Sequence, residues 1–212
     1  QYQMRREFMD YYKQRKEVAM FCNLIYEKGY TQASGGNLSC RVPGTDLFAI
    51  KKTGVNMRFT TETDILIVDQ DGNVVYGEGK PSKEAGFHLG VYKIRPEVNA
   101  FIHCHPNYAI AIANNEMDLP LVTVTARKAV GYVPWIDTAL AGSDELRDYV
   151  VEGFSKNPDS KAILMKEHGV SVAGPSLEAA FNIVDLIEQT AKQAFIQVMI
   201  AQNKEKFQEL FK

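Results

Sequence analysis

Two of the four histidines in this 212-residue chain stand one residue apart, in the segment Asn99-Ala-Phe-Ile-His-Cys-His-Pro-Asn107. Side chains two positions apart on a strand point to the same side, so His103 and His105 should face one spot while Cys104 faces away. Imidazole nitrogens that share a face are typical metal ligands. His168, which follows a second apolar run, is the candidate for a third nitrogen. Three nitrogens would leave one coordination position of a zinc ion open.

The remaining histidine and a nearby glutamate have simpler explanations. His88 lies four residues after Glu84 on a predicted helix, which favours a structural or supporting role over direct metal binding. A glutamate in the first turn of a helix interacts favourably with the helix dipole, and many such residues have no other role. For Glu84 the residue pattern alone favours the dipole, and only the motifs described below change that interpretation.

The elements that must position these side chains follow from the spacing of apolar residues. Residues 4–28 predict a helix that ends at Gly29, and a Gly-Gly turn follows it. The segment Asp71-Gly-Asn73 is a turn signal between two apolar runs. The front half of the chain is therefore rich in short strands, which we expect at 38–42, 47–50, 65–68 and 74–76.

The second half alternates helices with strands. Ser82 is expected to cap a helix that ends before Pro96, and a short helix should follow Pro106. Ser143 and Ser176 should cap two more helices, of which the second is the long final helix. Further strands are expected at 98–103, 121–124, 162–165 and 170–172. Helices and strands mixed in this way, without repeats, predict an α/β class in which helices cover a sheet.

Composition and charge exclude several classes of protein. A hydrophobic fraction of 45% and a charged fraction of 24% are ordinary for a globular protein and argue against disorder. With 24 basic and 26 acidic side chains, the net charge of −2 gives no overall attraction to nucleic acid or to an anionic membrane. We expect one domain over residues 1–212, with no transmembrane segment.

Cysteine use and the start of the chain bear on location. Three cysteines, an odd number without CxxC spacing, favour a reducing compartment, so a cytoplasmic protein is expected. The first residues lack the apolar core of a signal peptide. Gln1 is not a methionine, which predicts processing or truncation upstream.

Five short segments occur in an order that resembles the class II aldolase/adducin family, and within it the fuculose-phosphate aldolase branch. They are Ser34-Gly-Gly-Asn-Leu-Ser39, Lys52-Thr-Gly54, Pro81-Ser-Lys-Glu84, His103-Cys-His-Pro106 and Glu167-His-Gly169. Each motif is weak alone, but the ordered set is specific for the superfamily. The resemblance implies a single-domain, three-layer α/β/α sandwich with a central mixed, largely antiparallel sheet.

The resemblance also implies a metal-dependent reaction. His103, His105 and His168 would bind one divalent ion per subunit, usually Zn²⁺. Glu84 would be a ligand in the empty site and the acid/base during turnover. The ion would stabilise the enediolate formed when a ketose 1-phosphate, L-fuculose 1-phosphate as first choice, is cleaved to dihydroxyacetone phosphate and an aldehyde such as L-lactaldehyde. The residues implied in binding the substrate phosphate are Gly36, Asn37, Thr53, Gly54, Ser82 and Lys83.

Several positions depart from the pattern of fuculose aldolases. Lys83 replaces a second serine, and a lysine there either pairs with the phosphate or points to solvent. Thr123 stands near the position of a tyrosine that serves the aldehyde end of the substrate, with Tyr132 as a candidate substitute. A second tyrosine is expected in the tail, but residues 206–212 contain none. These differences weaken the assignment of L-lactaldehyde and leave the metal site untouched.

Three alternatives share the fold. Pentulose-phosphate 4-epimerases typically carry an aspartate where this chain has Glu84, which argues against that branch. A methylthioribulose-phosphate dehydratase shares the metal-ligand pattern, so the motifs do not exclude this alternative. An adducin-like head is a noncatalytic assembly module in which the metal ligands are expected to be lost, whereas all of them are present here.

A homotetramer with active sites near subunit interfaces is the assembly that the resemblance implies. In that assembly the tail would approach a neighbour's pocket and place Phe207 or Phe211 where fuculose aldolases have a tyrosine. The final helix offers modest support, because it has more apolar residues than one buried face needs. Burial inside the monomer would explain them as well. These residues are Phe195, Ile196, Val198, Met199 and Ile200.

Overall fold

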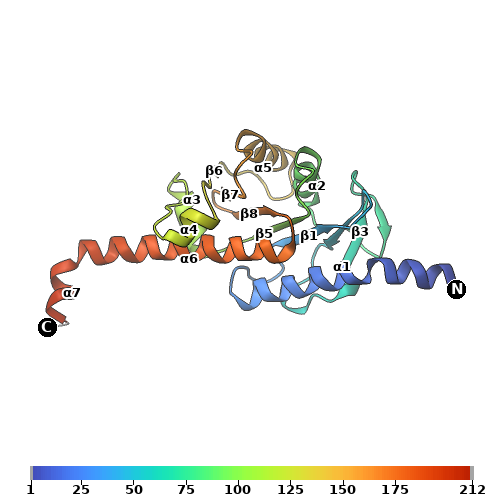
Figure 1. Ribbon diagram of the computed structural model, residues 1–212, viewed down its shortest axis with the longest axis horizontal. Coiled ribbons are helices and arrows are strands. Elements are labelled where there is room, and N and C mark those ends of the chain that lie inside the picture. The colour runs from blue at the N-terminus through green and yellow to red at the C-terminus, as the bar shows by residue number, and fades with distance from the viewer. Residues whose placement is uncertain (1, 211–212) are drawn as a thin grey trace.

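The computed structural model describes the backbone of residues 2–210 and the side chains of residues 11–210, and it forms a layered α/β fold (Figure 1). An eight-stranded sheet has the order β4-β3-β2-β1-β5-β8-β7-β6. All neighbouring strands are antiparallel except β6 and β7. The predicted mixed, largely antiparallel sheet is therefore confirmed. Its strands are β1 (Asn37–Arg41), β2 (Phe48–Lys51), β3 (Ile65–Val68), β4 (Val74–Tyr76), β5 (Ala100–Cys104), β6 (Trp135–Ile136), β7 (Ala162–Met165) and β8 (Gly169–Gly174).

Helices cover both faces of this sheet. Helices α1 and α6 contact one face, and α2 and α5 lie together on the other (Figure 1). Helices α3 and α4 lie against α6, and two short 3₁₀ helices connect β2 to β3. The helix bounds are α1 (Tyr2–Glu27), η1 (Met57–Phe59), η2 (Glu62–Asp64), α2 (Ala85–Ile94), α3 (Asn107–Asn114), α4 (Val124–Ala129), α5 (Asp144–Lys156), α6 (Leu177–Gln202) and α7 (Lys204–Leu210).

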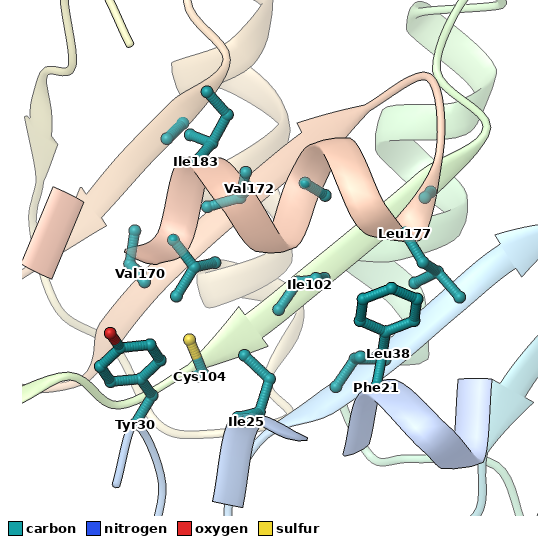
Figure 2. Close-up of a cluster of buried hydrophobic side chains, with 14 of the residues drawn as sticks. Phe21, Ile25, Tyr30, Leu38, Ile102, Cys104, Val170, Val172, Leu177 and Ile183 are labelled. Carbon is teal, nitrogen blue, oxygen red and sulfur yellow. The ribbon is translucent and has the colours of Figure 1, made fainter. Parts of the chain in front are cut away.

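Alternation along the central strands divides the core in two. On β5, Ile102 and Cys104 belong to the cluster between the sheet and the α1/α6 layer, together with Val170 of β8 (Figure 2). Phe101 belongs to the second cluster, between the sheet and the α2/α5 layer. Because side chains alternate, His103 points to the same layer as Phe101, where Phe87 of α2 lies against it. The expectation that Cys104 faces away from the histidines is confirmed.

Two sequence-based expectations are wrong. Residues 121–124 form no strand, because the Thr123 side chain instead accepts the Ala126 N–H at 3.1 Å and caps α4. Ser82 is not the N-cap of α2, which begins at Ala85 with Glu84 at the cap position. The Ser82 N–H donates to the carbonyl oxygen of Lys51, so the segment before α2 is held extended against β2.

Other local predictions hold. Ser143 caps α5 and Ser176 caps α6, each through a side-chain oxygen that accepts an N–H of the first turn. No helix among the described residues is long and apolar enough to cross a membrane.

The second half of α6 and all of α7 extend beyond the layered body (Figure 1). In that half Phe195 and Val198 are 51% and 54% exposed, so burial within the monomer does not account for them.

Candidate metal centre and substrate pocket

Three histidines meet because strands β5 and β8 pair. His103 is the fourth residue of β5, His105 follows the strand directly, and His168 immediately precedes β8. The antiparallel register places Cys104 opposite Val170, so the end of β5 lies beside the start of β8. Residues that are more than 60 positions apart in the sequence thereby reach one spot at the sheet edge.

The two strands approach so closely at this point that only glycine fits. A Cβ atom on Gly169 would lie 2.2 Å from the carbonyl oxygen of Cys104 and 2.9 Å from the ring of His105. Glu167, in the turn before β8, has a φ of 57°, a left-handed conformation that residues other than glycine seldom adopt. Asn114 Oδ1 accepts the Glu167 N–H at 2.6 Å and helps to hold this turn. The backbone therefore sets the position of His168.

His105 is held from the other side of the sheet. Its backbone N–H donates to the carbonyl oxygen of Tyr30 at 2.7 Å, which ties it to the segment after α1. Helix α3 begins two residues later. At the N-terminus of α3, the N–H groups of Tyr108 and Ala109 donate to the buried Glu188 of α6, at 3.1 and 3.0 Å. On the pocket side, a Cβ atom on Gly35 would lie 2.8 Å from the His105 ring.

The atoms that face one another have the spacing of a metal coordination shell. The Nε2 atoms of His103 and His105 are 3.1 Å apart, and all three histidines offer a ligand nitrogen within 4.8 Å of the others. Glu84 Oε1 lies 3.1 Å from His168 Nε2, and Oε2 lies 3.5 Å from His103 Nε2. For zinc–nitrogen bonds of about 2.0–2.1 Å, the edge of a regular tetrahedron of ligands is about 3.3 Å long. The residues therefore fit a divalent ion.

Burial keeps the ligand nitrogen of His103 in the form that binds a cation. His103 is fully buried, and its burial, together with the neighbouring His105 and His168, holds the pKa of its imidazole well below the usual value. Its Nδ1 faces the carbonyl oxygen of Val170 at 3.1 Å, so the proton of the neutral ring belongs on Nδ1. The lone pair of His103 Nε2 is then free for a metal ion.

Glu84 adds a carboxylate to this cluster from the N-terminus of α2. Burial disfavours its charge, but His103, His168 and the Asn37 amide outweigh burial and hold the pKa of the Glu84 carboxyl far below its usual value. Asn37 Nδ2 donates to Oε2 at 2.7 Å. A buried carboxylate needs positive charge beside it. A divalent ion held by these imidazoles would supply that charge.

A polar pocket of about 320 Å³ opens beside the cluster. Glu84, His105 and His168 are in its wall, whereas His103 lies buried behind them. Gly36 has a φ of 75°, and a Cβ atom there would meet the carbonyl oxygen of His103 at 2.9 Å. The pocket wall also contains all six residues that the motifs implied in phosphate binding: Gly36, Asn37, Thr53, Gly54, Ser82 and Lys83.

Among the charged residues of the pocket wall, Lys51 was missed by sequence reasoning. Lys51 of β2 is 2% exposed, and its Nζ has only a long contact of 3.5 Å, to the carbonyl oxygen of Lys52, among the hydrogen bonds of the described residues. Burial lowers the pKa of the Lys51 ammonium. The neighbouring Lys52 instead pairs with Asp64 at 2.7 Å. The signal in the sequence was strand alternation, which places Lys51 on the same face as the buried Ala49.

Three residues considered for the aldehyde end of the substrate lie elsewhere. Thr123 caps α4, Tyr132 is 56% exposed, and neither is in the pocket wall. Phe207 lies on α7, beyond the layered body of its own chain (Figure 1). Phe211 lies outside the described residues. Within one chain, none of the described candidates replaces the expected tyrosines.

Replacing His168 should remove the metal ion without unfolding the protein. Loss of a residue that only supports a metal ligand typically lowers metal affinity about 10–100-fold. We expect His168→Ala, which removes a ligand itself, to lower zinc affinity by more than this. Zinc titration against a chromophoric chelator, with metal content by mass spectrometry, measures this. Lys166→Ala, which removes ion pairs with Glu116 and Asp137 outside the histidine cluster, is the matched control and should bind zinc as the wild type does. Equal zinc affinity of the two variants would refute the site.

Comparison with known proteins agrees with this geometry. The chain matches the class II aldolase and adducin N-terminal domain family over residues 16–195. It is 32% identical over 180 residues to an L-fuculose phosphate aldolase of Methanococcus maripaludis, covering 85% of this chain and 95% of the relative. It is 31% identical to a 3-oxo-tetronate 4-phosphate decarboxylase of Haemophilus influenzae, covering 86% and 87%. A solved L-fuculose 1-phosphate aldolase has a TM-score of 0.82 at 30% identity, covering 89% of this chain and 87% of that one. The chain therefore belongs to the class II aldolase and adducin family.

Proposed function

We propose that this class II aldolase-family enzyme is a zinc-dependent aldehyde-lyase that cleaves a ketose 1-phosphate, with L-fuculose 1-phosphate as first choice. The products would be dihydroxyacetone phosphate and an aldehyde such as L-lactaldehyde. The observation that carries the proposal is the carboxylate of Glu84, which lies 3.1 Å from His168 Nε2 in the wall of a polar pocket. A cation site and a proton carrier thereby adjoin the space where a substrate would lie.

The chain's own residues divide the work of the reaction. A bound divalent ion supplies Lewis acidity, which stabilises the negative charge that develops on the substrate when its carbon–carbon bond breaks. His103, His105 and His168 would hold that ion and keep it at the pocket wall. Glu84 would carry a proton to the carbon that becomes the new end of dihydroxyacetone phosphate, and would remove it in the synthetic direction.

The substrate phosphate would bind in the same pocket. Gly36 and Gly54 have no side chain between their backbone and a ligand, and the hydroxyl groups of Thr53 and Ser82 can donate hydrogen bonds. Ser82 Oγ accepts the Glu84 N–H at 3.3 Å and still has its own proton to donate. Lys51 and Lys83 bring positive charge, and an anion would stabilise the ammonium form of the buried Lys51.

A panel of phosphorylated substrates tests the reaction. The zinc-loaded protein is incubated with ketose 1-phosphates, ketose 5-phosphates and a 3-oxo-tetronate 4-phosphate, and the products are identified by NMR. Cleavage of L-fuculose 1-phosphate to dihydroxyacetone phosphate is the expected result. Epimerisation, dehydration or decarboxylation without cleavage would assign a different reaction to this site. No turnover with any compound would favour a noncatalytic, adducin-like assembly module.

Removing the proton carrier should abolish turnover and keep the metal. Glu84→Gln preserves the shape of the side chain but cannot carry a proton, so we expect a loss of about 10²–10⁴ in kcat. Steady-state kinetics and metal content measure the two properties separately. Glu152→Gln on α5, which removes an exposed carboxylate paired with Lys156, is the matched control. Near-normal cleavage by Glu84→Gln would remove Glu84 from the proposed mechanism.

The exposed end of α6 supports assembly into a homotetramer, with each pocket near a subunit interface. Four of its large apolar side chains are at least 40% exposed: Phe195, Val198, Met199 and Ile200. Helix α7 lies beyond the layered body of its own subunit (Figure 1). In the proposed tetramer it would reach the pocket of a neighbouring subunit.

Disrupting this surface should therefore reduce assembly and activity together. A charge at Val198 is unfavourable in an apolar interface, so we expect Val198→Glu to sediment mainly as the 23.8-kDa monomer and to lose most activity. Asn182→Glu adds the same charge to an exposed position in the first half of α6 and should leave both properties unchanged. Sedimentation velocity at the assay concentration is the measurement. A fully active wild-type monomer would exclude the proposed assembly.

A further inference from the structure

Four buried polar side chains form a row through the apolar layer between the sheet and α2. Asn37 and Ser39 come from β1, and His88 and Tyr92 come from α2. None of the four is more than 3% exposed. The row starts at the Glu84 carboxylate and ends at Tyr92, about two helical turns further along α2. None of its members is part of the three-histidine cluster.

The members are joined by hydrogen bonds of ordinary to short length. Asn37 Nδ2 donates to Glu84 Oε2 at 2.7 Å, and Asn37 Oδ1 faces His88 Nε2 at 2.5 Å. Ser39 Oγ lies 2.7 Å from His88 Nδ1 and 2.8 Å from the Tyr92 hydroxyl. The stacked ring of Phe87 and the ring of Phe101 enclose His88. Apolar surroundings make an unpaired polar atom costly here, so every member must use the partner it has.

The ends of the row fix the direction of every hydrogen bond. A carboxylate only accepts, so the Asn37 amide must turn its NH₂ group toward Glu84 and its oxygen toward His88. His88 must then carry its proton on Nε2, and burial keeps the ring neutral by lowering the pKa of His88 to about 3. Nδ1 is therefore an acceptor for the Ser39 hydroxyl, and Ser39 Oγ accepts from the Tyr92 hydroxyl.

We propose that Asn37, His88, Ser39 and Tyr92 are positioning residues that hold Glu84 Oε2 through a hydrogen-bond chain of one fixed direction. Oε2 is then the anchored oxygen, and Oε1, which faces His168, is the oxygen that exchanges the proton with substrate. The inference rests on the proposed role of Glu84 as proton carrier. It also gives Asn37 a role besides phosphate binding, because its side-chain nitrogen contacts Glu84 and its side-chain oxygen contacts His88.

A purely structural role for His88 makes different predictions. A histidine that only fills space would be replaced adequately by phenylalanine, which has a similar ring and no cost of polar burial. In the proposed chain, phenylalanine removes the donor to Asn37 Oδ1, so the amide can rotate and turn its oxygen toward the carboxylate. Glutamine, whose amide NH₂ can reach the position of His88 Nε2, should restore the donor.

Kinetics of paired variants test the link to Glu84. We expect His88→Phe to lower kcat about 10–100-fold, as loss of an outer-shell partner typically does, with KM and zinc content little changed. His88→Gln should recover most of this loss. In the Glu84→Gln background, His88→Phe should cost almost nothing more, because the residue that it positions is already inactive. Equal losses with and without Glu84, or no rescue by glutamine, would overturn the proposal.

Nitrogen-15 NMR of the histidine-labelled wild type tests the bond direction without any turnover. The chain has four histidines, and the signals of His88 are those that disappear in His88→Gln. We expect a protonated, pyrrole-type Nε2 and an unprotonated, pyridine-type Nδ1 that stay unchanged when zinc is added. A proton on Nδ1 would overturn the proposal. If the wild type cleaves no ketose phosphate but His88 shows the expected tautomer, the proposed function fails and the hydrogen-bond chain stands.

Discussion

Strand β5 pairs with β1 on one side and with β8 on the other, and the whole site depends on these two pairings. The first places Asn37 opposite His103, and the second places the turn that carries His168 beside the end of β5. Between β5 and β8 the backbones are so close that a Cβ atom on Gly169 would overlap the carbonyl oxygen of Cys104. The spacing of the imidazoles thus follows from backbone contact rather than from flexible side chains, which suits a site that must bind a metal ion at defined distances.

Electrostatics adds the second constraint. The α2/α5 side of the sheet is apolar, and burying a carboxylate and several imidazoles there costs free energy unless each finds a partner. Glu84 faces His103, His168 and Asn37, and Asn37 in turn faces His88. The polar groups are therefore organised as one connected network, in which a change at one residue alters the orientation of the next. Such a network defines the geometry of the carboxylate more tightly than a single contact would.

The pocket joins two kinds of chemistry in a small volume. Its wall contains Glu84, His105 and His168 together with glycine backbone, hydroxyl groups and Lys51. Cation-binding and anion-binding groups are therefore neighbours in one pocket. Among the described residues, no tyrosine of this chain is in the pocket wall.

Local sequence determined much of this molecule. Strand alternation alone predicted that His103 and His105 share a face and that Cys104 turns away, and the serines before α5 and α6 predicted their caps, since these features depend on adjacent residues. The helix pattern also favoured a structural or supporting role for His88 over direct metal binding, and its ring contacts Ser39 and Asn37 outside the three-histidine cluster. Glu84 required the ordered motifs, because an acidic residue at a helix start has an ordinary electrostatic explanation.

Only the tertiary structure decided which distant groups meet. Thr123 sits in an apolar run that resembles a strand, yet its hydroxyl caps α4, because a side chain that satisfies a helix N–H competes with strand pairing. Ser82 is not the N-cap of α2, because its N–H donates to the carbonyl oxygen of Lys51 and holds this segment extended against β2. Lys51 became a buried cation because β1 and β3 flank β2 on both edges while α1 covers its face. Periodicity determines which way a side chain points, whereas its partner depends on strand register between segments far apart in the chain.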